Sequence, residues 1–273
     1  MTKSIPNIAS MALCPNEAGD QRRCRGRLEG RRIAITGGGS GIGRAIAERC
    51  VQEGAAVSVI GRRAEKLAEV QALTGAHAIR ADLREESAAT QAIEDSAQLM
   101  NGLDGLVNAA GVLDVCRFEE INLERWNESI LINLTVPFLA CRAALPHLHQ
   151  AIKAGKSPAI VNIAALAALM PGVSSAGYSA AKAGLLQFSR TIAAELGPAI
   201  RVNSICPGAV DTPMTNSFLE TPGADRDAFI SRYKLGRLAD AAEIAAIATF
   251  LLSSEASSVI GSTIVADGGR AYR

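Results

Sequence analysis

Residues 33–43 read IAITGGGSGIG, a short apolar run that passes directly into a cluster of glycines. The apolar run predicts a buried strand, and the residues after the glycines have the spacing of a helix. Glycines let the backbone turn tightly and approach a ligand closely, while a helix N-terminus offers free N–H groups and the positive end of a dipole. The stretch suits a pyrophosphate, although glycine-rich connections that bind nothing also occur.

The same alternation of short apolar runs and amphipathic segments continues along the chain. The expected strands are Arg32–Thr36, Ala56–Ile60, Ala76–Ala81, Gly105–Asn108, Ala159–Ile163, Arg201–Ile205 and Thr263–Ala266. The expected helices are Arg44–Glu53, Ala64–Leu73, Glu86–Leu99, Leu123–Lys153, Tyr178–Leu196 and Ala241–Leu252. This order predicts an α/β chain: a Rossmann-type, doubly wound parallel sheet with helices on both faces, in a single domain. At the first strand–helix junction of such a chain, the glycines predict dinucleotide binding.

Two regions depart from this rhythm. Residues 1–26 show no period and carry the basic cluster Arg22, Arg23 and Arg25, so we expect a flexible N-terminal extension. The stretch Thr212–Arg237 contains prolines and glycines among apolar and charged residues and is expected to act as a lid over the substrate.

Composition argues for an enzyme that acts on a small molecule. Lys and Arg number 28 against 27 Asp and Glu, so neither nucleic acid nor a membrane is an expected partner. The six cysteines form no C-x-x-C pair, and no metal site is expected. No secretory signal is recognisable, and the cytoplasm is the expected location.

The end of the second expected strand bears on the choice of dinucleotide. An NAD site usually places Asp or Glu there, about twenty residues beyond the glycines, to hold the ribose 2′-hydroxyl. This chain instead has Gly61 followed by Arg62 and Arg63. Guanidinium groups pair with a 2′-phosphate, so NADP(H) is favoured over NAD(H). The alternative is that the two arginines only begin a solvated helix.

A candidate proton-transfer pair lies in residues 178–182, which read YSAAK. Tyr178 and Lys182 are four residues apart and share one face of the expected helix. A free tyrosine has a pKa of about 10. A nearby positive charge, from Lys182 and a nicotinamide ring, favours the phenolate and is expected to lower that pKa, so Tyr178 could exchange a proton with a hydroxyl or ketone.

From about Leu28 to Gly269 the chain resembles the short-chain dehydrogenase/reductase family. The motifs that carry the resemblance are Thr36-Gly37-x-x-x-Gly41-Ile42-Gly43, Asp82-Leu83, Asn108-Ala109-Ala110-Gly111, Asn133, Tyr178-x-x-x-Lys182, Pro207-Gly208 and Asp267-Gly268-Gly269. It implies a catalytic domain over residues 27–273 that interconverts a ketone and a secondary alcohol, and a homotetramer or dimer.

The resemblance also assigns roles to residues. Tyr178 would be the general acid/base, Lys182 would bind the nicotinamide ribose, and Asn133 would anchor a water in a proton relay. The residues expected to bind the cofactor are Gly37, Ser40, Gly41, Ile42, Gly43, Arg62, Arg63, Asp82, Leu83, Asn108, Ala109, Gly111, Tyr178, Lys182, Pro207, Gly208, Val210 and Thr212. For Asp82 and Asn108 a purely structural role is the alternative.

Position 165 departs from the family pattern, because members place there a serine that hydrogen-bonds the substrate oxygen and this chain has Ala165. Loss of one such donor costs on the order of 3 kcal/mol. Three interpretations stay open. Ala165 is an engineered replacement of a serine, or a natural member uses another donor such as Ser174 or Ser175, or the protein binds cofactor in a regulatory or scaffold role with little turnover.

The residues expected to face the substrate are largely apolar. They are Leu166, Met170, Val173, Met214, Phe218, Leu219, Phe229 and Tyr233, with Arg232 and Lys234 nearby. A hydrophobic ketone or secondary alcohol fits this set better than a highly charged sugar phosphate. For any single residue of the set, packing of the lid is the alternative role.

Overall fold

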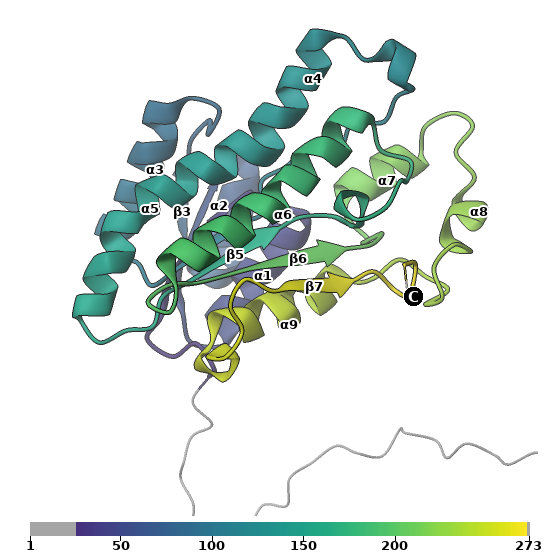
Figure 1. Ribbon diagram of the computed structural model, residues 1–273. Helices are drawn as coiled ribbons and strands as arrows, with labels where there is room; N and C mark the ends of the chain where they lie inside the picture. The colour runs from purple at the N-terminus through teal and green to yellow at the C-terminus, as the bar shows by residue number, and fades with distance from the viewer. Residues whose placement is uncertain (1–25, 272–273) are drawn as a thin grey trace, which may run out of the picture.

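Seven parallel strands form one sheet in the computed structural model of the protein, which describes residues 26–271 (Figure 1). The strands are β1 Arg32–Thr36, β2 Ala56–Gly61, β3 His77–Arg80, β4 Gly105–Asn108, β5 Ala159–Ile163, β6 Arg201–Pro207 and β7 Thr263–Ala266. Their order across the sheet is β3-β2-β1-β4-β5-β6-β7. The strand order reverses between β1 and β4, and this switch point is where open α/β sheets bind ligands. The expected fold class is confirmed.

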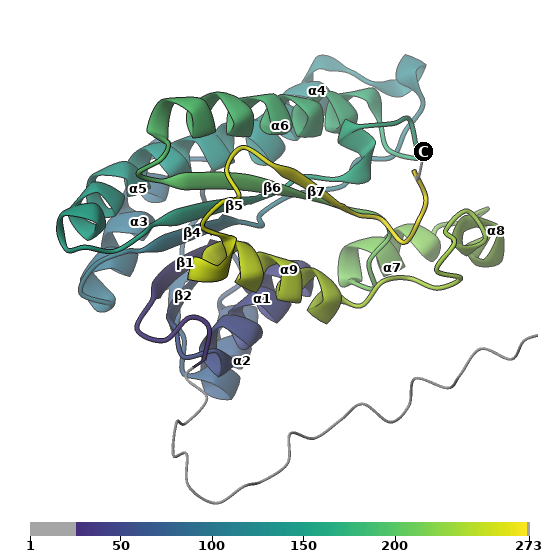
Figure 2. The ribbon, with the colours of Figure 1, turned by 60° about the horizontal axis from the view of Figure 1, so that its bottom comes forward.

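Helices cover both faces of the sheet (Figure 2). The helices α1 Gly41–Gln52, α2 Ala64–Thr74 and α9 Ala241–Leu252 pack on one face. The other face carries α3 Glu86–Leu99, α4 Leu123–Ile130, α5 Val136–Lys153 and α6 Ala176–Leu196. The short helices α7 Pro213–Leu219 and α8 Arg226–Ile230 lie beyond the carboxyl end of β6.

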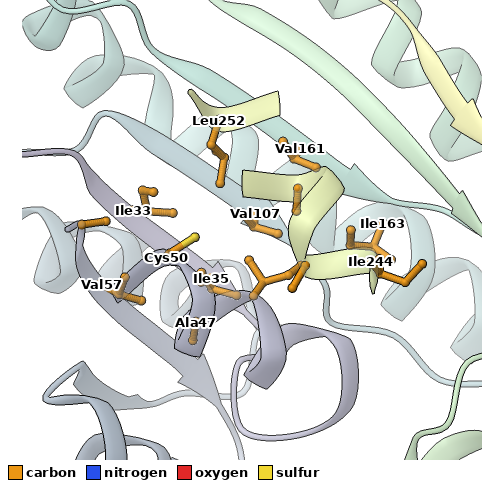
Figure 3. Close-up of a cluster of buried hydrophobic side chains, with 14 of the residues drawn as sticks. Ile33, Ile35, Ala47, Cys50, Val57, Val107, Val161, Ile163, Ile244 and Leu252 are labelled. Atoms are coloured by element: carbon orange, nitrogen blue, oxygen red, sulfur yellow. The ribbon is translucent and has the colours of Figure 1, made fainter. Parts of the chain in front are cut away.

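Both faces of the sheet are apolar, which is why the strands read as continuous apolar runs. In β1, Ile33 and Ile35 point to one face and Ala34 to the other. Figure 3 shows Ile33 and Ile35 packed with Ala47 of α1 and Ile244 of α9. Small side chains in these helices allow close packing against the sheet and fix the N-terminus of α1 beside the end of β1.

One expected helix, Leu123–Lys153, contains a feature that its sequence pattern did not predict. The segment is continuous, but α4 passes into a π-helical turn, η2 Leu131–Thr135, before α5 begins. Single π turns inside α-helices are frequent at functional sites. The segment is long and apolar enough to cross a membrane, yet half of its most apolar window is buried in the domain, as in a core helix.

The remaining expected boundaries differ from the structure by a few residues. The helix α1 begins at Gly41, inside the glycine cluster, and α6 begins at Ala176, two residues before Tyr178. The expected lid, Thr212–Arg237, contains α7 and α8 joined by turns. The expected N-terminal extension lies outside the described residues except for Gly26.

Candidate active site

Two adjoining cavities lie at the carboxyl end of the sheet. The larger has a volume of about 550 Å³ and the smaller about 180 Å³. Five residues line both cavities: Ile42, Ala164, Tyr178, Thr212 and Met214. The expected catalytic tyrosine therefore lies where the two cavities meet.

The glycine turn forms one wall of the larger cavity, together with the expected residues Ser40 and Ile42. Gly37 has a φ of +69°, and a Cβ there would lie 2.7 Å from the Ala110 Cα. A Cβ at Gly43 would overlap the Gly37 carbonyl oxygen. Because a real Cβ does not make contacts this close, only glycine permits this turn and the close packing of α1 behind it. The cradle that results fits a pyrophosphate at a helix N-terminus.

Positive side chains gather at the end of the larger cavity beside β2. Arg62 and Arg63 both line it, and Arg63 Nη2 donates to Ser40 Oγ at 3.0 Å. Lys66, one turn into α2, also lines the cavity and forms an ion pair with Glu69 at 2.7 Å. Sequence reasoning missed Lys66, although its spacing of one helical turn from Arg62 and Arg63 was a usable signal.

Asp82 and Leu83, which are among the residues expected to bind the cofactor, also line the larger cavity, as do Ala109 and Gly111. Asp82 is bound by Arg84, whose Nε donates to Asp82 Oδ1 at 2.9 Å. Hydrogen bonding from Arg84 lowers the pKa of the Asp82 carboxyl, so this carboxylate is already paired.

Tyr178 and Lys182 lie on the inner face of α6 and are both buried. Lys182 Nζ donates to the Ile163 carbonyl at 2.9 Å and lies 5.9 Å from the centroid of the Tyr178 ring. Burial lowers the pKa of Lys182 to about 8. Burial also raises the pKa of the Tyr178 hydroxyl, with a smaller contribution from Cys206. Desolvation therefore dominates the tyrosine pKa in the protein alone, and the lowering expected from Lys182 together with a nicotinamide ring stays a prediction.

The side chain of Asn133 is held at the π-helical turn. Its Nδ2 donates to the carbonyl oxygens of Val112 and Ser129, each at 3.1 Å, and its Oδ1 accepts from the Val112 N–H at 3.3 Å. A Cβ at Gly111 would lie 3.0 Å from Asn133 Oδ1 and 3.6 Å from Lys182 Nζ. Asn133 thus holds the segment after β4 close to Lys182. The role of Asn133 as an anchor for a water stays a prediction.

Four of the residues expected to contact the cofactor do not line the larger cavity. Asn108 is buried in β4, where its Nδ2 donates to Asn162 Oδ1 of β5 at 2.8 Å, an arrangement that ties the two strands together. Pro207, Gly208 and Val210 line the smaller cavity. Thr212 lines both cavities and caps α7, accepting from the Thr215 N–H.

The smaller cavity contains most of the expected substrate-facing residues, namely Leu166, Met170, Val173, Met214, Phe218, Phe229, Arg232 and Tyr233. Ala165 lines it as well, and Leu219 and Lys234 do not. Phe229 packs edge to face against Phe218 and at a tilt against Tyr233, with ring centroids 5.5 and 5.6 Å apart, so the lid provides a continuous aromatic wall. Sequence reasoning missed Arg270, which lines the cavity from beyond β7.

The two serines that could substitute for a serine at position 165 differ in placement. Ser174 lines the smaller cavity, and its Oγ is 3.1 Å from Ser179 Oγ. Ser175 is buried as the N-cap of α6, where its Oγ accepts from the Tyr178 N–H at 3.3 Å. Only Ser174 lies where it can reach a substrate. Within residues 26–271, no cluster of His, Cys, Asp and Glu suits a metal ion.

Comparison with known proteins agrees with this geometry. The family model described as Enoyl-(Acyl carrier protein) reductase matches residues 37–271. A 2,5-dichloro-2,5-cyclohexadiene-1,4-diol dehydrogenase, LinX, from Sphingobium indicum is 37% identical over 250 residues, which are 89% of this chain and 97% of the relative. This chain is therefore similar to a dehydrogenase along nearly its whole length.

Two solved structures extend the comparison to the cofactor. A short chain dehydrogenase from Burkholderia cenocepacia, in complex with NADP, has a TM-score of 0.80 and 32% identity and covers 90% of this chain and 100% of that one. A 3-ketoacyl-(acyl-carrier-protein) reductase from Brucella melitensis, complexed with NADH, has a TM-score of 0.84 and 30% identity with the same coverage. Proteins of this architecture therefore bind either nicotinamide cofactor.

Proposed function

The chain belongs to the short-chain dehydrogenase/reductase family, and on that premise we propose that it interconverts a ketone and a secondary alcohol with NADP(H), using Tyr178 as general acid/base. Its relatives are dehydrogenases and reductases that act on CH–OH and C=O groups, so the chain is an oxidoreductase of this kind. The observation that supports the proposal best is the position of Tyr178, which lines both the larger cavity and the smaller, apolar one.

The residues present fit a nicotinamide dinucleotide. The glycine cradle and the N-terminus of α1 would hold the pyrophosphate, and Lys182 would bind the ribose from the buried side of the cavity. When bound, the nicotinamide ring accepts or supplies the hydride, and its oxidised form adds a positive charge. A positive charge near Tyr178 opposes the effect of burial on its pKa.

The proton steps belong to this chain's own side chains. In reduction, the Tyr178 hydroxyl donates its proton to the developing alkoxide, and in oxidation the phenolate accepts the proton of the alcohol. Lys182 stands behind Tyr178 and is held by the Ile163 carbonyl, so its charge has a fixed position. Asn133 fixes the segment that faces Lys182.

The preference for NADP(H) rests on the positive end of the larger cavity. Arg62, Arg63 and Lys66 lie together there, and Ser40 accepts a hydrogen bond from Arg63. A 2′-phosphate would meet two guanidiniums, while a free 2′-hydroxyl would lack the carboxylate that usually binds it. Reduction is the direction that an NADP(H) preference favours.

The substrate we propose is a small, largely apolar ketone or secondary alcohol. The lid rings and the aliphatic side chains of the smaller cavity favour an apolar body next to the reacting carbon. The relative from Sphingobium indicum is named for a chlorinated cyclic diol, which has this character. The cytoplasmic location and the homotetramer or dimer stay predictions.

The test is NADPH oxidation against a panel of cyclic and open-chain ketones, repeated with NADH. We expect at least one ketone to be reduced, with a higher kcat/KM for NADPH than for NADH. Reduction with NADH only would contradict the cofactor proposal. NADPH binding without turnover of any ketone would favour the regulatory or scaffold role.

A further inference from the structure

We propose that the substrate carries one anionic group, a carboxylate or sulfonate, which binds between Arg232 and Arg270 on the lid side of the smaller cavity. The inference deepens the proposed function and rests on it, because it concerns the substrate that Tyr178 would serve. The apolar lining would then hold the body of the substrate while the two guanidiniums hold its charged end.

The charged side chains that line the smaller cavity are all positive. Arg232 and Arg270 both line it, and the described residues that line it include no carboxylate. Within residues 26–271, neither guanidinium has a carboxylate oxygen within ion-pair distance, whereas arginines such as Arg84, Arg125 and Arg237 do. Two positive groups at one small cavity repel each other, and an anion between them removes that repulsion.

The nearest carboxylate on the C-terminal side is already engaged. Asp267 is buried, and its two oxygens accept from the backbone N–H groups of Gly269 at 3.0 Å and Ala271 at 2.6 Å. These bonds shape the turn that follows β7 and occupy both carboxylate oxygens, and Asp267 forms no ion pair with Arg270 among the described residues.

The two arginines come from segments that are fixed to each other. The Leu235 N–H donates to the Gly268 carbonyl at 2.9 Å, which joins the end of the lid to the turn after β7. Gly268 and Gly269 have φ values of +61° and +74°, and a Cβ at Gly269 would lie 3.0 Å from the Lys234 Cβ. This close approach places Arg270 beside the segment that carries Arg232.

The charges of both arginines act on the Tyr233 hydroxyl, which belongs to the same cavity. Burial raises the pKa of Tyr233, the charges of Arg270 and Arg232 act to lower it, and the charge of Asp267 acts to raise it. Both guanidiniums are therefore close enough to the Tyr233 hydroxyl to influence it. Arginine suits a carboxylate or sulfonate because its planar fork of donors matches two oxygens at once.

The size of the cavity limits the substrate. At about 180 Å³ it is smaller than the 300–1,000 Å³ that is typical of ligand sites. A short or cyclic oxo acid fits such a space, with its carbonyl at Tyr178 and its charge at the two arginines.

The test compares three oxo acids with their methyl esters: 4-oxopentanoate, 5-oxohexanoate and 4-oxocyclohexanecarboxylate. Ester formation removes the charge and keeps the ketone. The proteins are the wild type, Arg232→Gln, Arg270→Gln and the control Arg226→Gln, an exposed arginine of α8 outside both cavities.

We expect the wild type to favour an acid over its ester by tenfold or more in kcat/KM. Each cavity variant should lower kcat/KM for that acid by about 10- to 100-fold and for the ester by less than about threefold. Arg226→Gln should change neither.

Equal use of acid and ester in all three pairs, or equal losses on both in the variants, would overturn the inference and leave the proposed function intact. If no compound is reduced, the proposed function fails on this panel, and calorimetry of the three acids with the NADP-loaded protein decides the inference separately. Binding that Arg270→Gln weakens tenfold supports the anion site, and absence of binding by all three acids overturns it.

Discussion

Position 165 decides which group meets the substrate oxygen in the smaller cavity. Ala165 lines that cavity together with Tyr178, and its methyl group donates no hydrogen bond. Of the two serines that precede α6, Ser174 lines the cavity and Ser175 does not. The Ser174 hydroxyl already contacts Ser179, so it would have to exchange that partner to serve a substrate.

For this reason we expect Ala165→Ser to raise kcat for a reduced ketone by about a hundredfold, since one donor to a developing oxyanion contributes on that order. The measurement is steady-state NADPH oxidation by the two proteins at equal concentration. Equal kcat values would instead assign the donor role to Ser174, and Ser174→Ala would then lose activity.

Arg62 and Arg63 are the residues proposed to select NADP(H) over NAD(H). Replacing each with alanine should raise KM for NADPH by about 10- to 100-fold and change KM for NADH by less than threefold, because only NADPH has the 2′-phosphate. Arg80→Ala, an exposed arginine of β3 outside the cavity lining, is the matched control. A similar rise for both cofactors would show that the arginines do not read the phosphate.

Sequence patterns predicted the positions of some single residues better than others. The glycine turn, Tyr178 and Lys182 line the larger cavity, and spacing along one turn or one helix was enough to group them. Arg270 was missed because it approaches the cavity through a glycine turn and a hydrogen bond to the lid, and neither contact leaves a periodic pattern. Asn108 was expected at the cofactor but pairs with Asn162, a contact between strands that lie far apart in the sequence.

At the scale of elements, the N-terminus of α6 positions Tyr178, the proposed general acid/base. Ser175 caps the helix by accepting from the Tyr178 N–H, and its own N–H donates to the Asp114 carbonyl at 2.8 Å. Burial acts to raise the pKa of the Asp114 carboxyl, but hydrogen bonds from Arg125, Ser175 and Cys116 outweigh it and lower that pKa. A chain of contacts therefore runs from Arg125 through Asp114 to the first turn of α6.

Ser175→Ala should therefore lower the free energy of unfolding by about 1 kcal/mol, the usual cost of a lost cap. It should also lower kcat about tenfold, because the first turn that carries Tyr178 loses its anchor. Asp240→Ala removes the cap of α9, which lines neither cavity, and should lower stability alone. Urea unfolding and steady-state kinetics on both variants separate the two effects, and an unchanged kcat in Ser175→Ala would contradict the positioning role.

The elements themselves were largely predictable, because buried parallel strands read as short continuous apolar runs and amphipathic helices follow a period of 3.6 residues. The π-helical turn at Asn133 was not, since one extra residue in a helix barely changes the apolar pattern around it. The predicted start of α6 at Tyr178 is two residues late, because Ser175 is the N-cap and the helix begins at Ala176.

At the scale of the whole molecule, a buried lysine makes stability depend on pH. Lys182 has a pKa of about 8 in the folded protein and an ordinary value of 10.5. Between these values the unfolded chain binds more protons than the folded one, so the contribution of Lys182 to stability rises with pH. Burial raises the pKa of Cys50, Cys141 and Cys206, so the contribution of these thiols to stability falls as the pH rises.

The difference in unfolding free energy between the wild type and Lys182→Met isolates the lysine. We expect the wild type to gain about 2 kcal/mol relative to the variant between pH 8 and pH 9.5. Urea unfolding of both proteins, reduced and without cofactor, gives this difference. A constant difference across that range would mean that Lys182 is not desolvated as the structure indicates.

The fold as a whole was predictable because strand–helix alternation admits few arrangements other than a parallel sheet covered on both faces. The division of the site into two cavities that share Tyr178 was not, because it depends on how the lid and the turn after β7 meet.

The role of Tyr178 is tested by Tyr178→Phe, which removes one hydroxyl and keeps the ring. For a ketone that the wild type reduces, kcat should fall about a thousandfold, within the usual range for the loss of a general acid. The dissociation constant for NADPH, measured by cofactor fluorescence, should stay within threefold. If the variant retains kcat within tenfold of the wild type, Tyr178 is not the general acid/base and the proposed mechanism is wrong.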